Sequence, residues 1–289
     1  MAEKGISNTA LGAAICRMIE QYEPAATRLF VDPFAEAFVG PVVHLLLRFR
    51  GMRRLTMSQM DAITPGIFGA QVCRTRRIDD AVRAALAEGT AQLVILGAGL
   101  DSRPYRLKGL ENVKVFEVDL PAVQAIKRKK IRKRLGGEPG NVVFVPIDFE
   151  AQALGPTLEA AGFDPSRRTL FLWEGVTQYL REEAVRRILA FVGGTRAGNG
   201  IVLTYVLKSI IEHRSDIKGA DQMMARIARS APWVFGIEPS GVEAFLEPVH
   251  LRRIADVGEA DYQRDYLLPL KRSLAVFPGE RVVQATVTR

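Results

Sequence analysis

Cysteine and histidine are scarce in this sequence of 289 residues, which has two of the first and three of the second. Cys16 and Cys73 are too few and too far apart for a disulfide framework or a cysteine-type zinc site. His44, His213 and His250 lack the close spacing of a metal-binding helix. We therefore expect free thiols, no metal and a reducing, cytoplasmic location.

Long uncharged apolar runs are also missing. No stretch approaches the roughly 18 residues that a membrane-spanning helix needs. The N-terminal segment begins with Glu3 and Lys4 and continues with polar residues at 7–9, so it lacks the basic and then apolar pattern of a secretion signal. These absences predict a cytoplasmic protein with no membrane partner.

Excess charge is confined to one segment. The chain has 40 Lys and Arg against 32 Asp and Glu, a formal charge of +8, and seven of the basic side chains fall within residues 127–134. Their spacing with apolar neighbours predicts a helix whose charges all face solvent. No aromatic residue interleaves them, so the sequence does not favour a nucleic-acid partner.

Short apolar runs alternate with helix-length segments from residue 92 onward. The runs are typical of strands buried on both faces and lie at 92–96, 113–118, 142–145, 169–173 and 201–206. The helix-length segments between them lie at 121–135, 150–161 and 181–193. This alternation predicts an α/β fold with a mostly parallel sheet and helices on both sides.

Three further regions complete the expected architecture. Residues 1–88 are predicted to form a helical N-terminal cap, and residues 208–247 an inserted helical lid. Residues 281–288 alternate between apolar and polar side chains and predict an edge or antiparallel strand. We therefore predict one domain over 1–289. Four lid side chains are candidates either for an apolar acceptor pocket or for the ordinary core of the lid: Met223, Met224, Trp233 and Phe235.

A glycine-containing loop follows the first predicted strand. Gly97 and Gly99 would let the backbone approach a ligand at the carboxyl ends of the strands. Asp119 ends the second strand about 20 residues later, where a carboxylate can accept hydrogen bonds from both ribose hydroxyls. A dinucleotide usually requires a third glycine where Ser102 stands. S-adenosylmethionine (SAM), which has no phosphate, fits this loop better than a dinucleotide does. A dinucleotide site and a turn that binds no cofactor remain as alternatives.

Two more acids end predicted strands. Asp148 could accept a hydrogen bond from the adenine amine while Phe149 packs on the base, and Glu174 would lie centrally, near the ammonium of the methionine moiety. Arg74, on the helix before the first strand, is the expected partner of the cofactor carboxylate. The alternative for each acid is a helix cap or a solvated strand end.

The order and spacing of these motifs resemble the leucine carboxyl methyltransferase and bacterial polyketide O-methyltransferase family. The strings that carry the resemblance are LGAGLDSRPYRL at 96–107, FEVDLP at 116–121, PIDF at 146–149, FLWEGVTQYL at 171–180, SNTALGAAICRMIE at 7–20 and LFVDPFAEAFV at 29–39. The resemblance implies a class I SAM-dependent methyltransferase fold, Rossmann-like, with seven strands of which the last is antiparallel.

The resemblance also implies roles for individual residues around SAM. The implied cofactor-binding set is Arg17, Arg74, Gly97, Gly99, Asp119, Asp148, Phe149 and Glu174. Glu150 stands where protein-methylating relatives have an arginine that grips the substrate carboxylate, so a phosphatase C-terminus is not the expected acceptor. A substrate that carries a carboxylate would then need a different cation to bind it, and the candidates are Arg17, Arg103 and Arg196.

Methyl transfer from a sulfonium needs positioning and water exclusion more than activation of the donor. A carboxylate acceptor needs no base, whereas a phenol or alcohol benefits from one. Glu174 and Tyr179 are the candidate catalytic groups, and the motifs contain no histidine. We therefore expect O-methylation of a carboxyl or acidic hydroxyl group on a small, secondary-metabolite acceptor. A base-assisted phenol or alcohol methyltransferase and an RNA- or DNA-directed one stay open, and the sequence indicates no oligomeric state.

Overall fold

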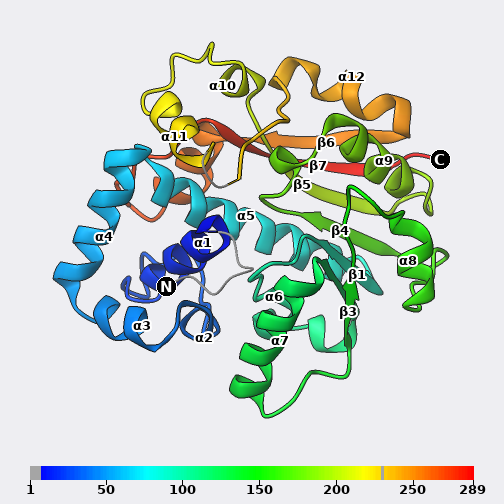
Figure 1. Ribbon diagram of the computed structural model, residues 1–289, viewed down its shortest axis with the longest axis horizontal. Helices are drawn as coiled ribbons and strands as arrows, with labels where there is room; N and C mark the ends of the chain where they lie inside the picture. Colours follow the sequence, from blue (N-terminus) through cyan, green and yellow to red (C-terminus); the bar gives the residue numbers. More distant parts are fainter. Residues whose placement is uncertain (1–7, 229–230) are drawn as a thin grey trace.

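A seven-stranded sheet forms the centre of the computed structural model, which describes residues 8–228 and 231–289 (Figure 1). The strand order is β3-β2-β1-β4-β5-β7-β6. The strands are β1 Gln92–Leu96, β2 Lys114–Asp119, β3 Val142–Pro146, β4 Thr169–Trp173, β5 Gly200–Val206, β6 Leu251–Val257 and β7 Glu280–Val287. β1 to β5 pair in parallel, and β7 runs antiparallel to both β5 and β6.

The five predicted parallel strands are confirmed to within about a residue. The predicted C-terminal strand is antiparallel as expected, but it lies inside the sheet between β5 and β6. The edge strand on this side of the sheet is β6, which the sequence analysis missed. Arg252 and Arg253 are exposed on this edge, and these charged residues interrupt the apolar pattern by which a strand is recognised in the sequence.

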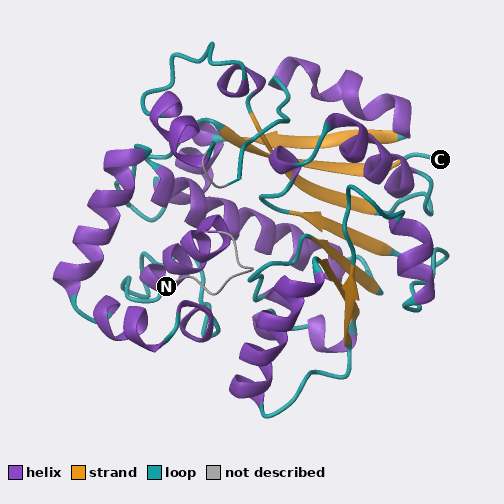
Figure 2. Cartoon of the chain, viewed as in Figure 1, coloured by secondary structure: helices purple, strands orange, loops and turns teal. Residues whose placement is uncertain are grey.

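Helices cover both faces of the sheet (Figure 2). Their bounds are α1 Asn8–Glu20, α2 Ala35–Val39, α3 Pro41–Leu47, α4 Arg50–Ile63, α5 Ile67–Ala87, α6 Arg103–Arg106, α7 Pro121–Leu135, α8 Leu154–Ala160, α9 Glu182–Gly193, α10 Lys208–Ile211, α11 Ala220–Ile227, α12 Val242–Leu246 and α13 Glu259–Tyr262. Short 3₁₀ or π turns follow or precede several of them. Residues 1–7 of the predicted cap and 229–230 of the predicted lid lie outside the described residues.

Helix boundaries follow local chemistry. α7 spans the predicted segment because Pro121 occupies its first turn and Gly136, at φ 76°, ends it in the left-handed region. α8 begins later than predicted because the carboxylate of Asp148 accepts the N–H of Glu150 and holds that segment in a turn. A turn, and not a helix, therefore follows the carboxyl end of β3 directly.

One basic side chain of α7 departs from the expected solvated face. Lys127 is buried, lies 2.8 Å from the Glu117 carboxylate and donates to the Ala98 carbonyl. The expectation was wrong here because position 127 lies on the same helix face as the buried Ile131. The ion pair offsets the cost of burying the ammonium and ties α7 to β2 and to the loop after β1.

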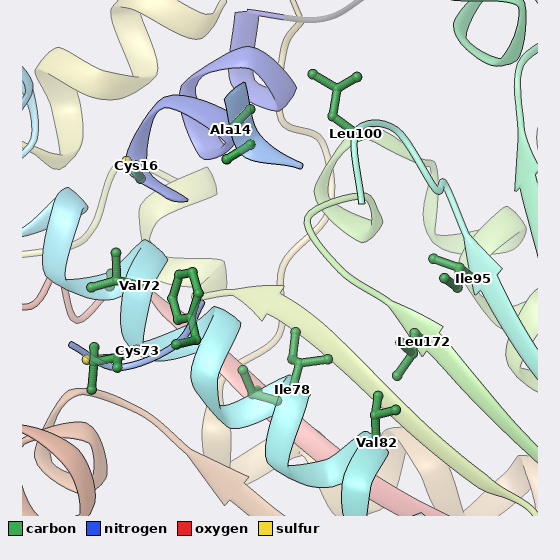
Figure 3. Packing of buried hydrophobic residues seen from close by; sticks show 14 of the residues in the cluster. Ala14, Cys16, Val72, Cys73, Ile78, Val82, Ile95, Leu100 and Leu172 are labelled. Carbon is green, nitrogen blue, oxygen red and sulfur yellow. The ribbon is translucent and has the colours of Figure 1, made fainter. Parts of the chain in front are cut away.

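Side chains from each strand alternate between two apolar layers. Leu93 and Ile95 pack on the side of α1, α5 and α7, and Val94 and Leu96 pack on the side of α8, α9 and α12. Figure 3 shows the first layer, in which Val72 and Ile78 of α5 lie with Ile95 and Leu172 of the sheet. The sheet is therefore rigid beneath its carboxyl edge.

The strand order reverses between β1 and β4. From β1 the chain proceeds outward to β2 and β3, and it then returns to place β4 on the other side of β1. Ligands of open α/β sheets bind at the carboxyl ends of the strands at such a point. Among the described helices, none is long and apolar enough to cross a membrane.

Candidate active site

A cavity of about 1290 Å³ lies at the carboxyl ends of the strands. Its walls come from the N-terminal helices, the loop after β1, the ends of β2, β3 and β4, and the segment after α11. Pockets for one small ligand are typically about 300–1,000 Å³. The cavity therefore has room for a cofactor and an acceptor together.

The loop after β1 forms the floor of this cavity. Gly97 has φ +68°, and a Cβ there would collide with the side chain of Val176. Gly99 has φ +39°, and its N–H donates to Asp119 at 2.6 Å. Both glycines line the cavity, so backbone is exposed where the sequence analysis expected a ligand to approach.

Asp119 lies at the end of β2 and lines the same cavity. Its two carboxylate oxygens accept the N–H groups of Gly99 and Leu120. Burial raises the pKa of this carboxyl, and the two N–H donors offset part of that effect. A carboxylate has about four acceptor positions, so two remain for hydroxyl donors.

The end of β3 contributes a more open wall. Asp148 is exposed, whereas Phe149 is buried, and both line the cavity. Glu150 accepts hydrogen bonds from Arg181, a pairing that lowers the pKa of the Glu150 carboxyl. The Asp148 carboxylate accepts the N–H of Glu150 and keeps further acceptor positions, so it and the ring of Phe149 offer an acceptor and a stacking surface to a flat nitrogen base.

Glu174, at the end of β4, lies between two buried arginines. Its oxygens accept from Arg74 Nε at 2.8 Å and from Arg103 Nη1 at 2.6 Å. Burial alone would raise the pKa of Glu174, but the guanidinium groups of Arg103 and Arg74 outweigh it and hold the pKa well below its usual range. Glu174 is therefore an ionised structural anion and a poor proton acceptor.

Arg74 is held by three partners. Besides Glu174, it donates to Glu280 at the start of β7 and to Gln71 one turn earlier on α5. A guanidinium has five N–H donors, so one on each Nη remains for a ligand carboxylate. Arg74 lines the cavity, as expected of the predicted partner of the cofactor carboxylate.

A second buried network fixes the loop after β1 to the N-terminal helices. Arg17 of α1 donates to Asp32 at 2.9 Å and to the carbonyl of Leu100 at 2.7 Å. Ser102 also donates to Asp32, at 2.7 Å. Arg106 binds both oxygens of Asp79 on α5. The predicted cofactor-side residue Arg17 therefore reaches the cavity wall by way of this loop.

Sequence reasoning missed several parts of these networks. Asp101 and Asp79 both pair with Arg103, and Glu280 pairs with Arg74. The string DSR at 101–103 was part of the resemblance, which was the available signal for Asp101 and Arg103. No local signal in the sequence marked Glu280, because its partner Arg74 is 206 positions away.

The other candidate cations differ in position. Arg103 lines the cavity but is already paired, whereas Arg196 lies in the exposed turn before β5, at the opposite end of the sheet, and is not among the lining residues. Arg226 of α11 does line the cavity and is exposed, although the sequence analysis did not single it out.

Only part of the predicted acceptor pocket forms. Met223 and Trp233 line the cavity, and Tyr179 lies with its ring centroid 6.5 Å from that of Trp233. Met224 and Phe235 instead pack in the two apolar layers, so for these two the alternative, ordinary core packing, holds. Trp173 of β4 and Tyr205 of β5 are also core residues.

The remaining acceptor-side wall comes from elements that sequence reasoning did not single out. Met60 and Ile63 of α4 and Ile227 of α11 line it. Two buried polar atoms here, Gln178 Oε1 and Trp233 Nε1, have no hydrogen-bond partner among the described residues. Such atoms usually have partners, and both residues belong to the cavity wall.

Fold comparison defines the class. A structure from Thermobifida fusca, provisionally named a methyltransferase, superposes with a TM-score of 0.61 at 16% identity, covering 83% of this chain and 90% of that one. A DUF574 protein from Streptomyces avermitilis gives 0.60 at 14% identity, covering 95% and 96%. The fold is that of the class I SAM-dependent methyltransferases, as the resemblance implied.

Sequence comparison defines the family. The family model of the leucine carboxyl methyltransferases matches residues 10–193, and the chain belongs to this family of SAM-dependent methyltransferases. A protein of Streptomyces coelicolor, provisionally named a SAM-dependent methyltransferase, is 33% identical over 214 residues, 72% of each chain. One of Mycobacterium tuberculosis with the same provisional name is 34% identical, covering 72% of this chain and 67% of its own.

Proposed function

We propose that SAM lies across the carboxyl ends of β1 to β4, with its ribose on Asp119, its adenine between Asp148 and Phe149, and its carboxylate on Arg74. The fit of this chain's own residues supports the assignment. Gly97 and Gly99 bring backbone to the cavity wall, and Asp119 and Arg74, which also line the cavity, keep spare acceptors and donors. When bound, SAM supplies a methyl group already activated by a sulfonium.

We further propose that the acceptor is a carboxylate of a small molecule. The observation that carries this proposal is that the acids at the centre of the cavity are already ion-paired. Glu174 and Glu280 pair with Arg74, and Asp101 pairs with Arg103. A group held by a guanidinium is a poor base, whereas a carboxylate acceptor needs no base. The task of these residues is then to position the acceptor and exclude water.

Recognition of that acceptor would use the groups that the cofactor leaves free. We propose that Arg226 meets its negative charge, and that Trp233 Nε1 and Gln178 Oε1 supply a donor and an acceptor to its polar groups. Met60, Ile63 and Met223 would contact its apolar body. We expect Arg226→Ala to raise KM about tenfold with little change in kcat, because it would remove binding of the charged group in both ground and transition states.

The test is the chemistry of the product. The enzyme would be incubated with methyl-labelled SAM and a panel of carboxylic acids matched to phenols of similar size, and the labelled product treated with mild alkali. We expect release of labelled methanol, because esters hydrolyse and ethers do not. A base-stable product made only from phenols would overturn the carboxylate proposal and leave a phenol methyltransferase in which Tyr179, beside Trp233, is the candidate base.

We also propose a cytoplasmic location and an acceptor from secondary metabolism. The state of the thiols supports the first: Cys16 and Cys73 are free and buried, and burial raises the pKa of each to about 12. Such thiols stay protonated and suit a reducing compartment. Fractionation of the producing cells tests the location, and an enzyme recovered outside the cytoplasm would contradict it.

A further inference from the structure

We propose that the surface formed by α3 and α4 binds an anionic lipid bilayer. We call it the α3–α4 surface and define it by exposed apolar and basic side chains: Val42, Leu45, Leu46, Phe49, Leu55, Arg48, Arg50 and Arg54. It lies on the outside of the molecule, at the left edge of Figure 1. It is separate from the cofactor residues, so the proposal stands without the function proposed above.

Large apolar side chains are unusually exposed on this surface. Val42 is 69% exposed, Phe49 61%, Leu45 56%, Leu55 49% and Leu46 44%. Scattered exposed apolar residues are normal, but these five lie within 14 consecutive positions, on two successive helices and the turn between them. α4 has 14 residues and none of them is buried. A helix with so little burial contributes little to the core, so its sequence is free to serve another contact.

The charge of the surface has one sign. Residues 37–60 contain four arginines and no Asp or Glu. Arg53 donates to the carbonyls of Leu47 and Arg48 and lies 4.3 Å from the ring centroid of Tyr22, so it fixes the corner between α3 and α4. The other three, at 48, 50 and 54, are exposed. The surface therefore offers positive charge beside apolar side chains.

This combination favours a bilayer over a second copy of the chain. A two-fold contact would place the same arginines against each other, and residues 37–60 supply no carboxylate to neutralise them. An anionic bilayer supplies charge complementarity to the arginines and an apolar boundary to the leucines and Phe49. The expectation of no membrane partner rested on the lack of a spanning segment, which does not bear on binding at the surface.

The position of α4 connects this surface to the cavity. The helix begins at Arg50, and Met60 and Ile63 near its other end line the cavity wall. Ten residues of helix span about 15 Å. A bilayer bound at Arg50 and Phe49 would therefore lie within about three helical turns of the acceptor side.

Vesicle co-sedimentation of the full chain tests the proposal. The probes are vesicles of phosphatidylcholine alone and vesicles that also contain phosphatidylglycerol. Two charge variants remove the same charge from two exposed helix faces: Arg50→Gln with Arg54→Gln on α4, and Lys129→Gln with Lys133→Gln on α7. A third variant, Leu45→Ser with Phe49→Ser, keeps the charge and removes apolar contact. Circular dichroism and SAM binding confirm that each variant folds.

We expect binding to the phosphatidylglycerol vesicles, a loss of about 30-fold in the α4 charge variant, and a comparable loss in the apolar variant. The α7 variant should change binding less than threefold. Equal losses in the two charge variants would overturn the proposal, because binding would then follow net charge alone. Equally, no binding to anionic vesicles would overturn it, as would a concentration-dependent dimer that the apolar variant abolishes.

Discussion

Asp119 is partly buried at the end of β2, where its carboxylate accepts hydrogen bonds from two N–H donors and can accept about two more. We expect Asp119→Asn to weaken binding of S-adenosylhomocysteine by about 30-fold, since hydrogen bonds to a charged group contribute about 1.5–3 kcal/mol. Isothermal titration calorimetry measures the change. Asp164→Asn, in an exposed loop at the opposite end of the sheet, is the matched control. Unchanged affinity in Asp119→Asn would refute the ribose assignment.

The same residue predicts a pH dependence. Burial raises the pKa of Asp119 above its ordinary value of 3.8, and ribose hydroxyls bind its ionised form. Binding of S-adenosylhomocysteine should therefore be full above that raised pKa and decline as the pH falls through it. Calorimetry at a series of acidic pH values checks this, and the Asp119→Asn variant should lose that step. A wild-type affinity that stays flat down to pH 3.8 would contradict the argument.

Glu174 predicts an effect on stability. Its pKa is lower in the folded chain than its ordinary 4.5, so its ionisation stabilises the fold fully above 4.5 and progressively less as the pH falls towards the folded-state pKa. Glu174→Gln leaves two buried arginines short of a partner and should cost about 3 kcal/mol at neutral pH. Urea unfolding measures the difference, which should shrink below pH 4.5. A difference in unfolding free energy between the wild type and Glu174→Gln that grew as the pH fell would contradict this prediction.

At the scale of elements, the C-terminal end of α9 packs against the backbone of Val249. A Cβ at Gly193 would collide with the carbonyl oxygen of Val249, whereas a Cβ at Gly51 of α4 would meet nothing within 4 Å. We expect Gly193→Ala to destabilise the fold by about 1–3 kcal/mol. Gly51→Ala, the matched control, should stabilise it by up to about 1 kcal/mol through helix propensity. Thermal unfolding compares them, and equal effects would show that α9 can shift at no cost.

The elements also show how far sequence reasoning reaches. The buried parallel strands were predictable because each is a continuous run of apolar and β-branched residues. Asp119 and Glu174 were predictable as site residues because the carboxyl ends of parallel strands lie at the same edge of the sheet. The edge strand β6 was not predicted because its exposed arginines break the pattern. Glu280 was not found as the partner of Arg74, since pairing across 206 positions depends on tertiary packing and leaves no local signal.

At the scale of the whole molecule, one cavity joins the N-terminal helices, the sheet edge and the segment after α11. A ligand bound there stabilises all three against unfolding. At 100 times its Kd, S-adenosylhomocysteine should add about 2.7 kcal/mol and raise the Tm by roughly 5 °C. Differential scanning calorimetry tests this, with NAD as the control ligand. A rise with NAD and none with S-adenosylhomocysteine would favour a dinucleotide enzyme.

The pairing of Arg74 with Glu280 has a consequence for biosynthesis. Arg74 is translated well before Glu280, which is one of its two carboxylate partners and the first residue of β7. While β7 is still inside the ribosome, the Arg74 guanidinium lacks Glu280, and β5 is paired with β4 but has no neighbour on its other edge. The wall of the cavity around Arg74 is therefore completed only when β7 has paired with β5.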